Sequence, residues 1–321
     1  MPKSRLAIIL LLLTLLACAP SPDDASSGDD GSALRIVVTT GMIADLTRQI
    51  VGDRAAVDAL MGPGTDPHLY KASESDVRRL AEADLILYNG LHLEGKIGDI
   101  LDKMARTRPV VAVAEGIAQD RLRADQGAVD PHLWFDVALW TEVIPPIVDA
   151  VAQIAPDQAA ALSARGDALR GDLMALDAWA EAALATIPRE RRILVTAHDA
   201  FGYLGQRYGL EVVGLQGLST LAEAGLDDVD RVVEQVVTRR IPAIFVESSV
   251  PTRTIEAVQQ ACAERGHAVA IGGELYSDAM GPAGTDAGTY VGMVRHNVRA
   301  IVAGLGGTLP ADDAAADAGT P

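Results

Sequence analysis

The chain has 321 residues, of which 49% are hydrophobic, and carries a formal net charge of −17 at pH 7. This length and apolar content allow two domains, each with a core of its own. The excess of acidic residues argues against nucleic acid as a partner, because that kind of binding depends on basic contacts to phosphate.

The N-terminus is typical of an exported protein. An apolar run, Leu6–Leu16, follows two basic residues and is too short to span a bilayer, so residues 1–17 are predicted to be a signal peptide. The run ends in Leu-Leu-Ala-Cys, which resembles the lipobox of bacterial lipoproteins and predicts a lipidated Cys18. Ordinary signal cleavage nearby is the alternative. We expect an extracytoplasmic protein, in the periplasm or on the cell surface, with residues 18–33 as a flexible tether.

From Leu34 onward, short β-rich runs alternate with helical patterns, which is typical of βα units around parallel sheets. The alternation stops at 156–188, where a long Ala/Leu-rich helical pattern begins at a proline, and resumes over 189–307. The predicted fold class is therefore α/β, with two similar lobes, each a mostly parallel sheet flanked by helices, joined by one long rigid helix. The N-terminal lobe covers 34–155, and the tail 308–321 is predicted to be disordered.

One five-residue pattern occurs twice, as Asp66-Pro67-His68-Leu69-Tyr70 and as Asp130-Pro131-His132-Leu133-Trp134. The proline before each histidine favours a stiff loop over a helix or a central strand. The aspartate is short enough to orient the loop backbone or a ring N–H, as the partners of metal-bound histidines do. Two proline turns with solvent-facing histidines would explain a single copy, but two copies favour a function.

The second lobe offers two more candidates after predicted strands. His198 follows the run Ile193–Thr196, and Asp278 follows the run Ala268–Ile271 by way of a Tyr-Ser-Asp segment. Ligands of open α/β sheets bind beyond the carboxyl ends of strands. Asp199 is expected to cap the next helix, and Glu247, at the end of another strand, is expected to cap the helix after it.

These segments together resemble the zinc- and manganese-binding solute receptors of bacterial ABC importers, over nearly the whole chain from Cys18. The resemblance rests on four segments: 64–68, 130–134, 196–203, and 275–278 with 288–290. It implies a metal ion held between two lobes by His68, His132, His198 and Asp278, and its delivery to a membrane permease. We also expect a monomer, tethered to the membrane by the lipid predicted on Cys18.

Three imidazoles and one carboxylate form a donor set that suits Zn²⁺, and the absence of a thiolate from the set disfavours Cu(I). Histidine at position 198 favours zinc over manganese or iron(II), which stay possible. Several zinc receptors of the family carry a His-rich acidic loop in the first lobe, whereas Glu115–Val129 contains no histidine. That difference weakens the zinc assignment but leaves the fold prediction unchanged.

Two other functions are compatible with the sequence: an exported zinc hydrolase with Glu247 or Asp199 as its base, and an adhesin with a structural metal. No His-Glu-x-x-His helix is present, and four protein ligands leave no open position for a catalytic water. We therefore expect a non-enzymatic receptor. The remaining histidines are expected at the surface or in structural roles, namely His92, His267 and His296.

Overall fold

A computed structural model describes residues 34–125 and 127–310. The predicted signal peptide 1–17, Cys18, the tether up to residue 33 and the tail from residue 311 lie outside the described residues.

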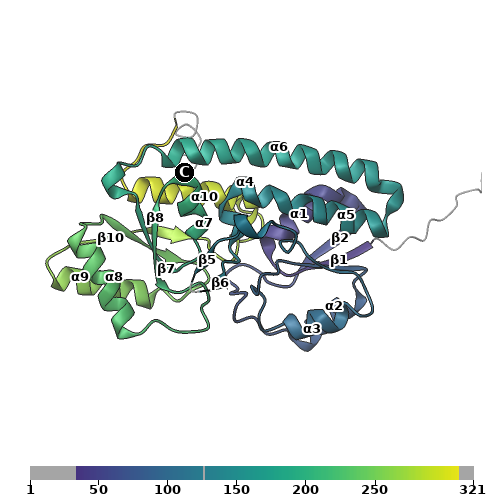
Figure 1. Ribbon diagram of the computed structural model, residues 1–321, viewed down its shortest axis with the longest axis horizontal. Helices are drawn as coiled ribbons and strands as arrows, with labels where there is room; N and C mark the ends of the chain where they lie inside the picture. Colours follow the sequence, from purple (N-terminus) through teal and green to yellow (C-terminus); the bar gives the residue numbers. More distant parts are fainter. Residues whose placement is uncertain (1–33, 126, 311–321) are drawn as a thin grey trace, which may run out of the picture. The chain divides into compact units, whose positions relative to one another are not determined.

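The N-terminal lobe is built on a four-stranded parallel sheet with the strand order β2-β1-β3-β4. Figure 1 labels β1 and β2 of this sheet. Three helices connect and flank the strands. Their bounds agree with the predicted alternation, and α2 begins at a capping box between Ser73 and Asp76. The strands are β1 (Leu34–Val38), β2 (Ala55–Ala59), β3 (Leu85–Tyr88) and β4 (Val110–Ala112), and the helices are α1 (Gly41–Val51), α2 (Glu74–Glu82) and α3 (Gly98–Met104).

A segment of short elements leads from this sheet to the long helix. It comprises an antiparallel pair of short strands and two helices, with 3-10 turns between them: β5 (Ala124–Asp125), β6 (Ala128–Val129), α4 (Val137–Trp140) and α5 (Ile144–Ile154). Among the described residues, Val137–Ile154 is the one stretch apolar and long enough to cross a membrane, and half of it is buried inside the fold. Its contacts with α1 and with the long helix are those of a core segment.

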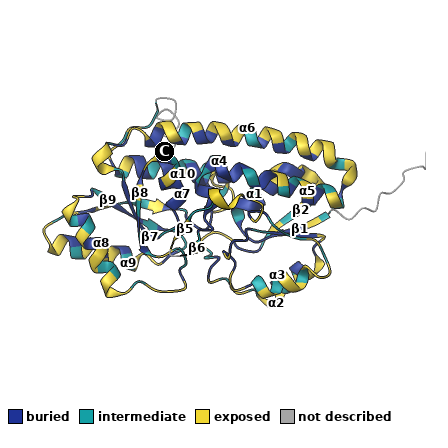
Figure 2. Cartoon of the chain, viewed as in Figure 1, coloured by how far each residue is buried: buried dark blue, intermediate teal, exposed yellow. Residues whose placement is uncertain are grey.

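The long helix, α6, spans Ala159–Leu184 and is preceded by a 3-10 turn at Pro156–Gln158. Figure 1 shows it running alongside elements of both lobes, and it packs on α1, α4 and α5 of the first and on α7 and α10 of the second. Its buried side recurs every three or four residues, as the banding in Figure 2 shows. Asp177, on that side, accepts hydrogen bonds from Arg207 and Tyr208, which ties the helix to α7.

The C-terminal lobe contains two parallel strand pairs, β7–β8 and β9–β10, with β7 lying beside β9. Helices again alternate with the strands. The strands are β7 (Ile193–His198), β8 (Glu211–Gln216), β9 (Ala243–Glu247) and β10 (Ala270–Leu275), and the helices are α7 (Gly202–Tyr208), α8 (Leu226–Thr238), α9 (Arg253–Glu264) and α10 (Tyr290–Gly304).

Two local predictions for this lobe were wrong. The last strand runs from Ala270 to Leu275 rather than from Ala268 to Ile271, because Gly272 and Gly273 form an irregularity inside the strand instead of ending it. Asp199 does not cap the next helix, since α7 begins three residues later, at Gly202, and has no side-chain cap.

The two lobes share one hydrophobic core. Alternate residues of β1 point to opposite faces of the sheet, so Ile36 and Val38 join the shared core while Val37 joins a smaller cluster of the first lobe. In β9, Phe245 joins the shared core and Ile244 the cluster of the second lobe. The inner faces of both sheets therefore pack on the same layer of helices. This shared layer fixes the position of the strand ends of one lobe relative to those of the other.

Candidate metal centre

The two repeated segments adopt the same local turn. In each, the aspartate carboxylate accepts a hydrogen bond from the histidine backbone two residues later, at 2.8 Å for Asp66 and His68 and at 3.0 Å for Asp130 and His132. Asp130 also accepts from Nδ1 of the His132 ring at 2.8 Å. The expectation that both aspartates orient their loops is confirmed, and Asp130 orients the ring as well.

The second-lobe candidates lie at the carboxyl ends of strands. His198 is the last residue of β7 rather than the residue after it, and Asp278 lies three residues beyond the end of β10. Because these parallel strands end at the same edge of their sheets, both side chains reach the seam between the lobes.

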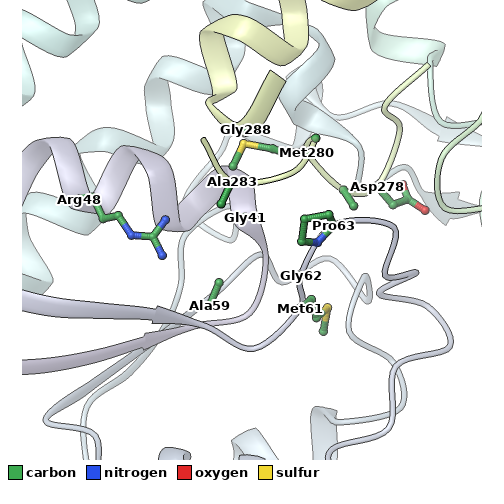
Figure 3. Close-up of a pocket in the computed structure, with 12 residues that line it drawn as sticks. Gly41, Arg48, Ala59, Met61, Gly62, Pro63, Asp278, Met280, Ala283 and Gly288 are labelled. Atoms are coloured by element: carbon green, nitrogen blue, oxygen red, sulfur yellow. The ribbon is translucent and has the colours of Figure 1, made fainter. Parts of the chain in front are cut away.

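Asp278 also borders a cavity of about 210 Å³ whose lining includes Met61, Pro63 and Met280. In Figure 3 the Asp278 carboxylate lies at the edge of this cavity, and Arg48 lies on the opposite side. A mainly apolar lining that includes a guanidinium does not suit a cation. A cation would therefore bind on the other side of Asp278, where the histidines are.

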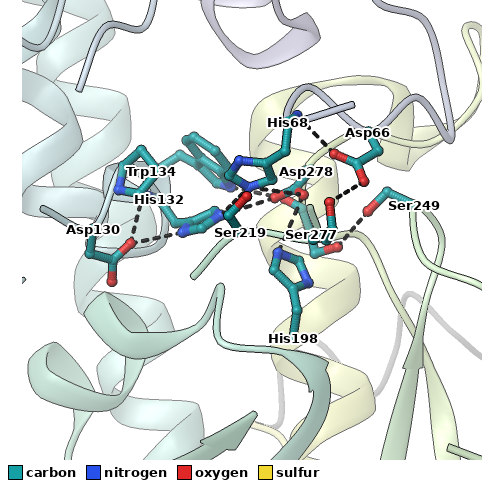
Figure 4. Close-up of polar contacts among 12 residues, drawn as sticks. Asp66, His68, Asp130, His132, Trp134, His198, Ser219, Ser249, Ser277 and Asp278 are labelled. Atoms are coloured by element: carbon teal, nitrogen blue, oxygen red, sulfur yellow. Dashed lines mark hydrogen bonds and ion pairs between the residues drawn. The ribbon is translucent and has the colours of Figure 1, made fainter. Parts of the chain in front are cut away.

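The structure brings the four predicted residues together. One ligand atom from each lies within 4.8 Å of the other three, and all four residues are at most 3% exposed (Figure 4). The Nε2 atom of His132 lies 3.3 Å from Nε2 of His68 and 3.4 Å from Oδ1 of Asp278. Nε2 of His198 lies 3.3 Å from Oδ2 of Asp278.

These three separations are close to the spacing of neighbouring ligand atoms in a tetrahedral zinc site, although the two that involve Asp278 use different oxygens of its carboxylate. With zinc–ligand bonds of about 2.0–2.1 Å, the ligand atoms of a tetrahedron lie about 3.3–3.4 Å apart. Nε2 of His68 is farther from Asp278, at 3.9 Å. Nε2 of His198 and both carboxylate oxygens of Asp278 are buried and have no hydrogen-bond partner within the described part of the chain. Buried polar atoms are rarely left unpaired, so this arrangement fits a cation at its centre.

Glu247 completes the support behind the histidines. Its two carboxylate oxygens accept hydrogen bonds from the backbone N–H of His198 at 2.8 Å and from Nδ1 of the His198 ring at 2.6 Å. The prediction that Glu247 caps the next helix was wrong, because α9 begins at Arg253 after Thr252. A proton held on Nδ1 leaves the Nε2 lone pair free to bind metal, so Glu247 does for His198 what Asp130 does for His132.

Replacing Glu247 with glutamine is expected to weaken metal affinity by about 10- to 100-fold. The glutamine amide can turn its NH₂ group toward Nδ1, which favours the tautomer that carries its proton on Nε2, where the metal must bind. Competition against a metal chelator measures the change. Glu211→Gln, an exposed glutamate on β8, serves as the control and should bind as the unmodified protein does. Equal affinities for the two variants would contradict the assigned role.

The pKa values of the four residues diverge strongly. Burial lowers the pKa of His68 to about 4. Burial also acts to lower the pKa of His132, but the carboxylates of Asp130 and Asp278 outweigh it and raise that pKa to about 9. Glu247 and Asp278 likewise raise the pKa of His198 against the effect of its burial.

Burial acts to raise the pKa of Asp278, but its histidine neighbours outweigh it and hold that pKa well below its usual range. Before metal binds, these shifts favour the ionised form of Asp278 and the protonated forms of the His132 and His198 rings. An incoming cation must displace those protons.

The other candidate side chains lie outside this group. His92 is exposed, and the rings of His267 and His296 contact the backbone carbonyls of Ile241 and Glu274. All three agree with the expected surface or structural roles.

The three aromatic residues near the motifs, Trp134, Tyr203 and Tyr70, have packing and hydrogen-bonding roles. The Trp134 ring packs edge-on against His132 with centroids 5.3 Å apart, and its Nε1 donates to the carbonyl of Ser277. The Tyr203 hydroxyl donates to the carbonyl of Asp130, and the Tyr70 hydroxyl donates to Asp76. Trp134 is thus the aromatic residue that lines the site directly.

Known proteins show the same organisation over the same length. A family model described as "Zinc-uptake complex component A periplasmic", ZnuA, matches residues 36–304. The zinc-binding protein TroA of Treponema pallidum is 47% identical over 299 residues, which cover 93% of this chain and 96% of TroA. The manganese-binding lipoprotein MntA of Bacillus subtilis is 44% identical over 301 residues, which cover 93% of this chain and 97% of MntA.

A solved structure of the periplasmic zinc-binding protein TroA from Treponema pallidum aligns with a TM-score of 0.84 and covers 85% of this chain and 99% of its own. The match extends through both lobes and the long helix, as expected from the resemblance to metal-binding solute receptors. The chain therefore belongs to the ZnuA family of periplasmic metal-binding proteins.

Proposed function

We propose that this protein captures one divalent transition-metal ion between its lobes and delivers it to the permease of an ABC importer, with His68, His132, His198 and Asp278 as the ligands. The observation that supports this most strongly is the convergence of three imidazole nitrogens and one carboxylate oxygen within 4.8 Å of one another in a buried site. The metal is cargo, and no catalytic step is involved. The hydrolase alternative loses one of its two candidate bases, because both oxygens of Glu247 accept hydrogen bonds from His198.

Zinc is the favoured cargo, since three imidazoles at this spacing suit a four-coordinate ion. Asp278 nevertheless gives the site some latitude. Its Oδ1 faces His132 and its Oδ2 faces His198, so both oxygens can bind the ion and raise the coordination number to five. Manganese and iron(II), which accept more oxygen ligands, therefore stay possible cargoes. The names of the relatives divide in the same way, between zinc for TroA and manganese for MntA.

Competitive titration of the metal-free protein with zinc, manganese and iron(II) under anaerobic conditions tests the proposal. We expect about one ion per chain, with zinc bound most tightly, as the general affinity order of divalent metals predicts. Manganese binding as tightly as zinc would overturn the zinc preference. Failure of all three ions to bind would overturn the receptor function itself.

Delivery also needs a place beside the membrane. We propose that the signal peptide 1–17 is removed, that Cys18 carries a lipid, and that residues 18–33 tether a monomeric receptor next to its permease. The relative MntA of Bacillus subtilis is named a lipoprotein, which supports this arrangement. The proposed boundaries are 34–155 for the N-terminal lobe, 156–188 for the linking helix and 189–307 for the C-terminal lobe.

A further inference from the structure

The four ligands are not held equally firmly. Nδ1 of His132 is bound to the carboxylate of Asp130 and Nδ1 of His198 to that of Glu247, and both carboxylates are buried. In the described residues, no carboxylate is hydrogen-bonded to the His68 ring in this way. The position of His68 therefore depends on its loop.

The segment of His132 is fixed to the second lobe by several hydrogen bonds. Trp134 donates to the carbonyl of Ser277 at 3.0 Å, and the Tyr290 hydroxyl donates to the carbonyl of Trp134 at 2.6 Å. The Tyr203 hydroxyl donates to the carbonyl of Asp130 at 3.1 Å. His132 thus stays with His198 and Asp278 whatever happens to the His68 loop.

The His68 loop has a single comparable tie. Apart from contacts of the His68 ring itself, the described residues give loop 62–72 one hydrogen bond to the second lobe, from the Thr220 hydroxyl to Oδ2 of Asp66 at 2.5 Å. The other oxygen of that carboxylate, Oδ1, accepts the His68 backbone N–H at 2.8 Å. Asp66 therefore connects the backbone of a metal ligand directly to the opposite lobe.

The two residues of this bond border a groove at the surface, although Thr220 itself is only 7% exposed. Asp66 and Thr220 line a surface groove of about 350 Å³, together with Leu69 and Ser249. Leu69, the residue after His68, is 47% exposed. A change at Thr220 can consequently act on the His68 loop without passing through the buried ligands.

We propose that the hydrogen bond between Thr220 and Asp66 is a latch between the lobes, which controls metal release by setting how readily His68 leaves the ion. This inference rests on the proposed function and extends it, because it names the ligand that departs first and the residue that restrains it. Thr220 is a positioning residue in this scheme and does not touch the metal.

The test is Thr220→Val, which keeps the β-branched shape and removes only the hydroxyl. After loading with zinc, the rate of metal transfer to an excess of chelator is followed. We expect the rate to rise by about ten- to a hundredfold, the range that follows from losing a hydrogen bond to a charged group. Metal should still bind at about one ion per chain, because all four ligands remain. Thr220→Ser, which restores a hydroxyl, should return the rate close to its original value.

Thr254→Val is the matched control, because Thr254 lines the same groove but donates to the nearby carbonyl of Pro251. Its release rate should equal that of the unmodified protein. The latch is overturned if Thr220→Val releases zinc within about twofold of the unmodified rate, or if Thr220→Ser behaves like the valine variant. Failure of the unmodified protein to bind zinc overturns the proposed function instead, so the two failures are distinguishable.

Discussion

Replacing His132 with alanine is expected to remove bound metal from the purified protein. Nε2 of His132 lies close to ligand atoms of both His68 and Asp278, at 3.3 and 3.4 Å. Its loss removes one of the four ligands and leaves the buried Asp130 carboxylate without the ring N–H hydrogen bond that it accepts. Partners behind a ligand are worth about 10- to 100-fold in affinity, so loss of the ligand itself should exceed that range.

Elemental analysis after dialysis against a weak chelator measures the effect, with about one ion per chain expected for the unmodified protein and none for His132→Ala. His296→Ala provides the control, because His296 is exposed and contacts a backbone carbonyl away from the group. Retention of full stoichiometry by His132→Ala would show that the converged residues are not the metal ligands. Loss of metal from both variants would point to a nonspecific effect of removing histidine.

The parts of the site predicted from sequence are those with local signals. Both Asp-Pro-His segments predict a stiff loop, and both form the same turn in the structure. His198 and Asp278 were predicted from the rule that ligands lie beyond strand ends, which survives an error of several residues in the end of β10. The long helix was visible as the one stretch where the alternation of strands and helices stops.

The parts that sequence reasoning missed depend on which distant segments become neighbours. Glu247 is 49 residues from His198, and Thr220 is 154 residues from Asp66. Nothing local to Glu247 distinguishes a helix cap from a ring partner. The distinction requires knowing that β7 and β9 lie side by side. A useful signal was nevertheless present in the sequence. The strand before Glu247 is otherwise apolar and ends in this glutamate, at the same edge of the sheet as His198. A carboxylate at that place lies next to a histidine.

Metal affinity is expected to rise with pH well beyond the usual range of histidine. In the metal-free protein the pKa of His132 is raised to about 9 and that of His198 is raised above its ordinary value, whereas His68, with a pKa of about 4, is already neutral. Binding at pH 7 must therefore release about two protons, one from His132 and one from His198. By linkage, affinity near pH 7 should rise about a hundredfold per pH unit, and less steeply once the pH approaches the pKa of either ring.

Calorimetric titrations in buffers of different protonation enthalpy count the released protons, and chelator competition at pH 6, 7 and 8 gives the slope. Asp130→Asn separates this cause from the general behaviour of histidine, because it removes the carboxylate that raises the pKa of His132 most directly. Proton release at pH 7 should then fall from about two to about one per ion. Histidines with the ordinary pKa of about 6.5 would instead give little release above pH 7.5 and a flat affinity there. A flat profile in the unmodified protein would mean that the carboxylates behind the imidazoles orient the rings without raising their pKa values.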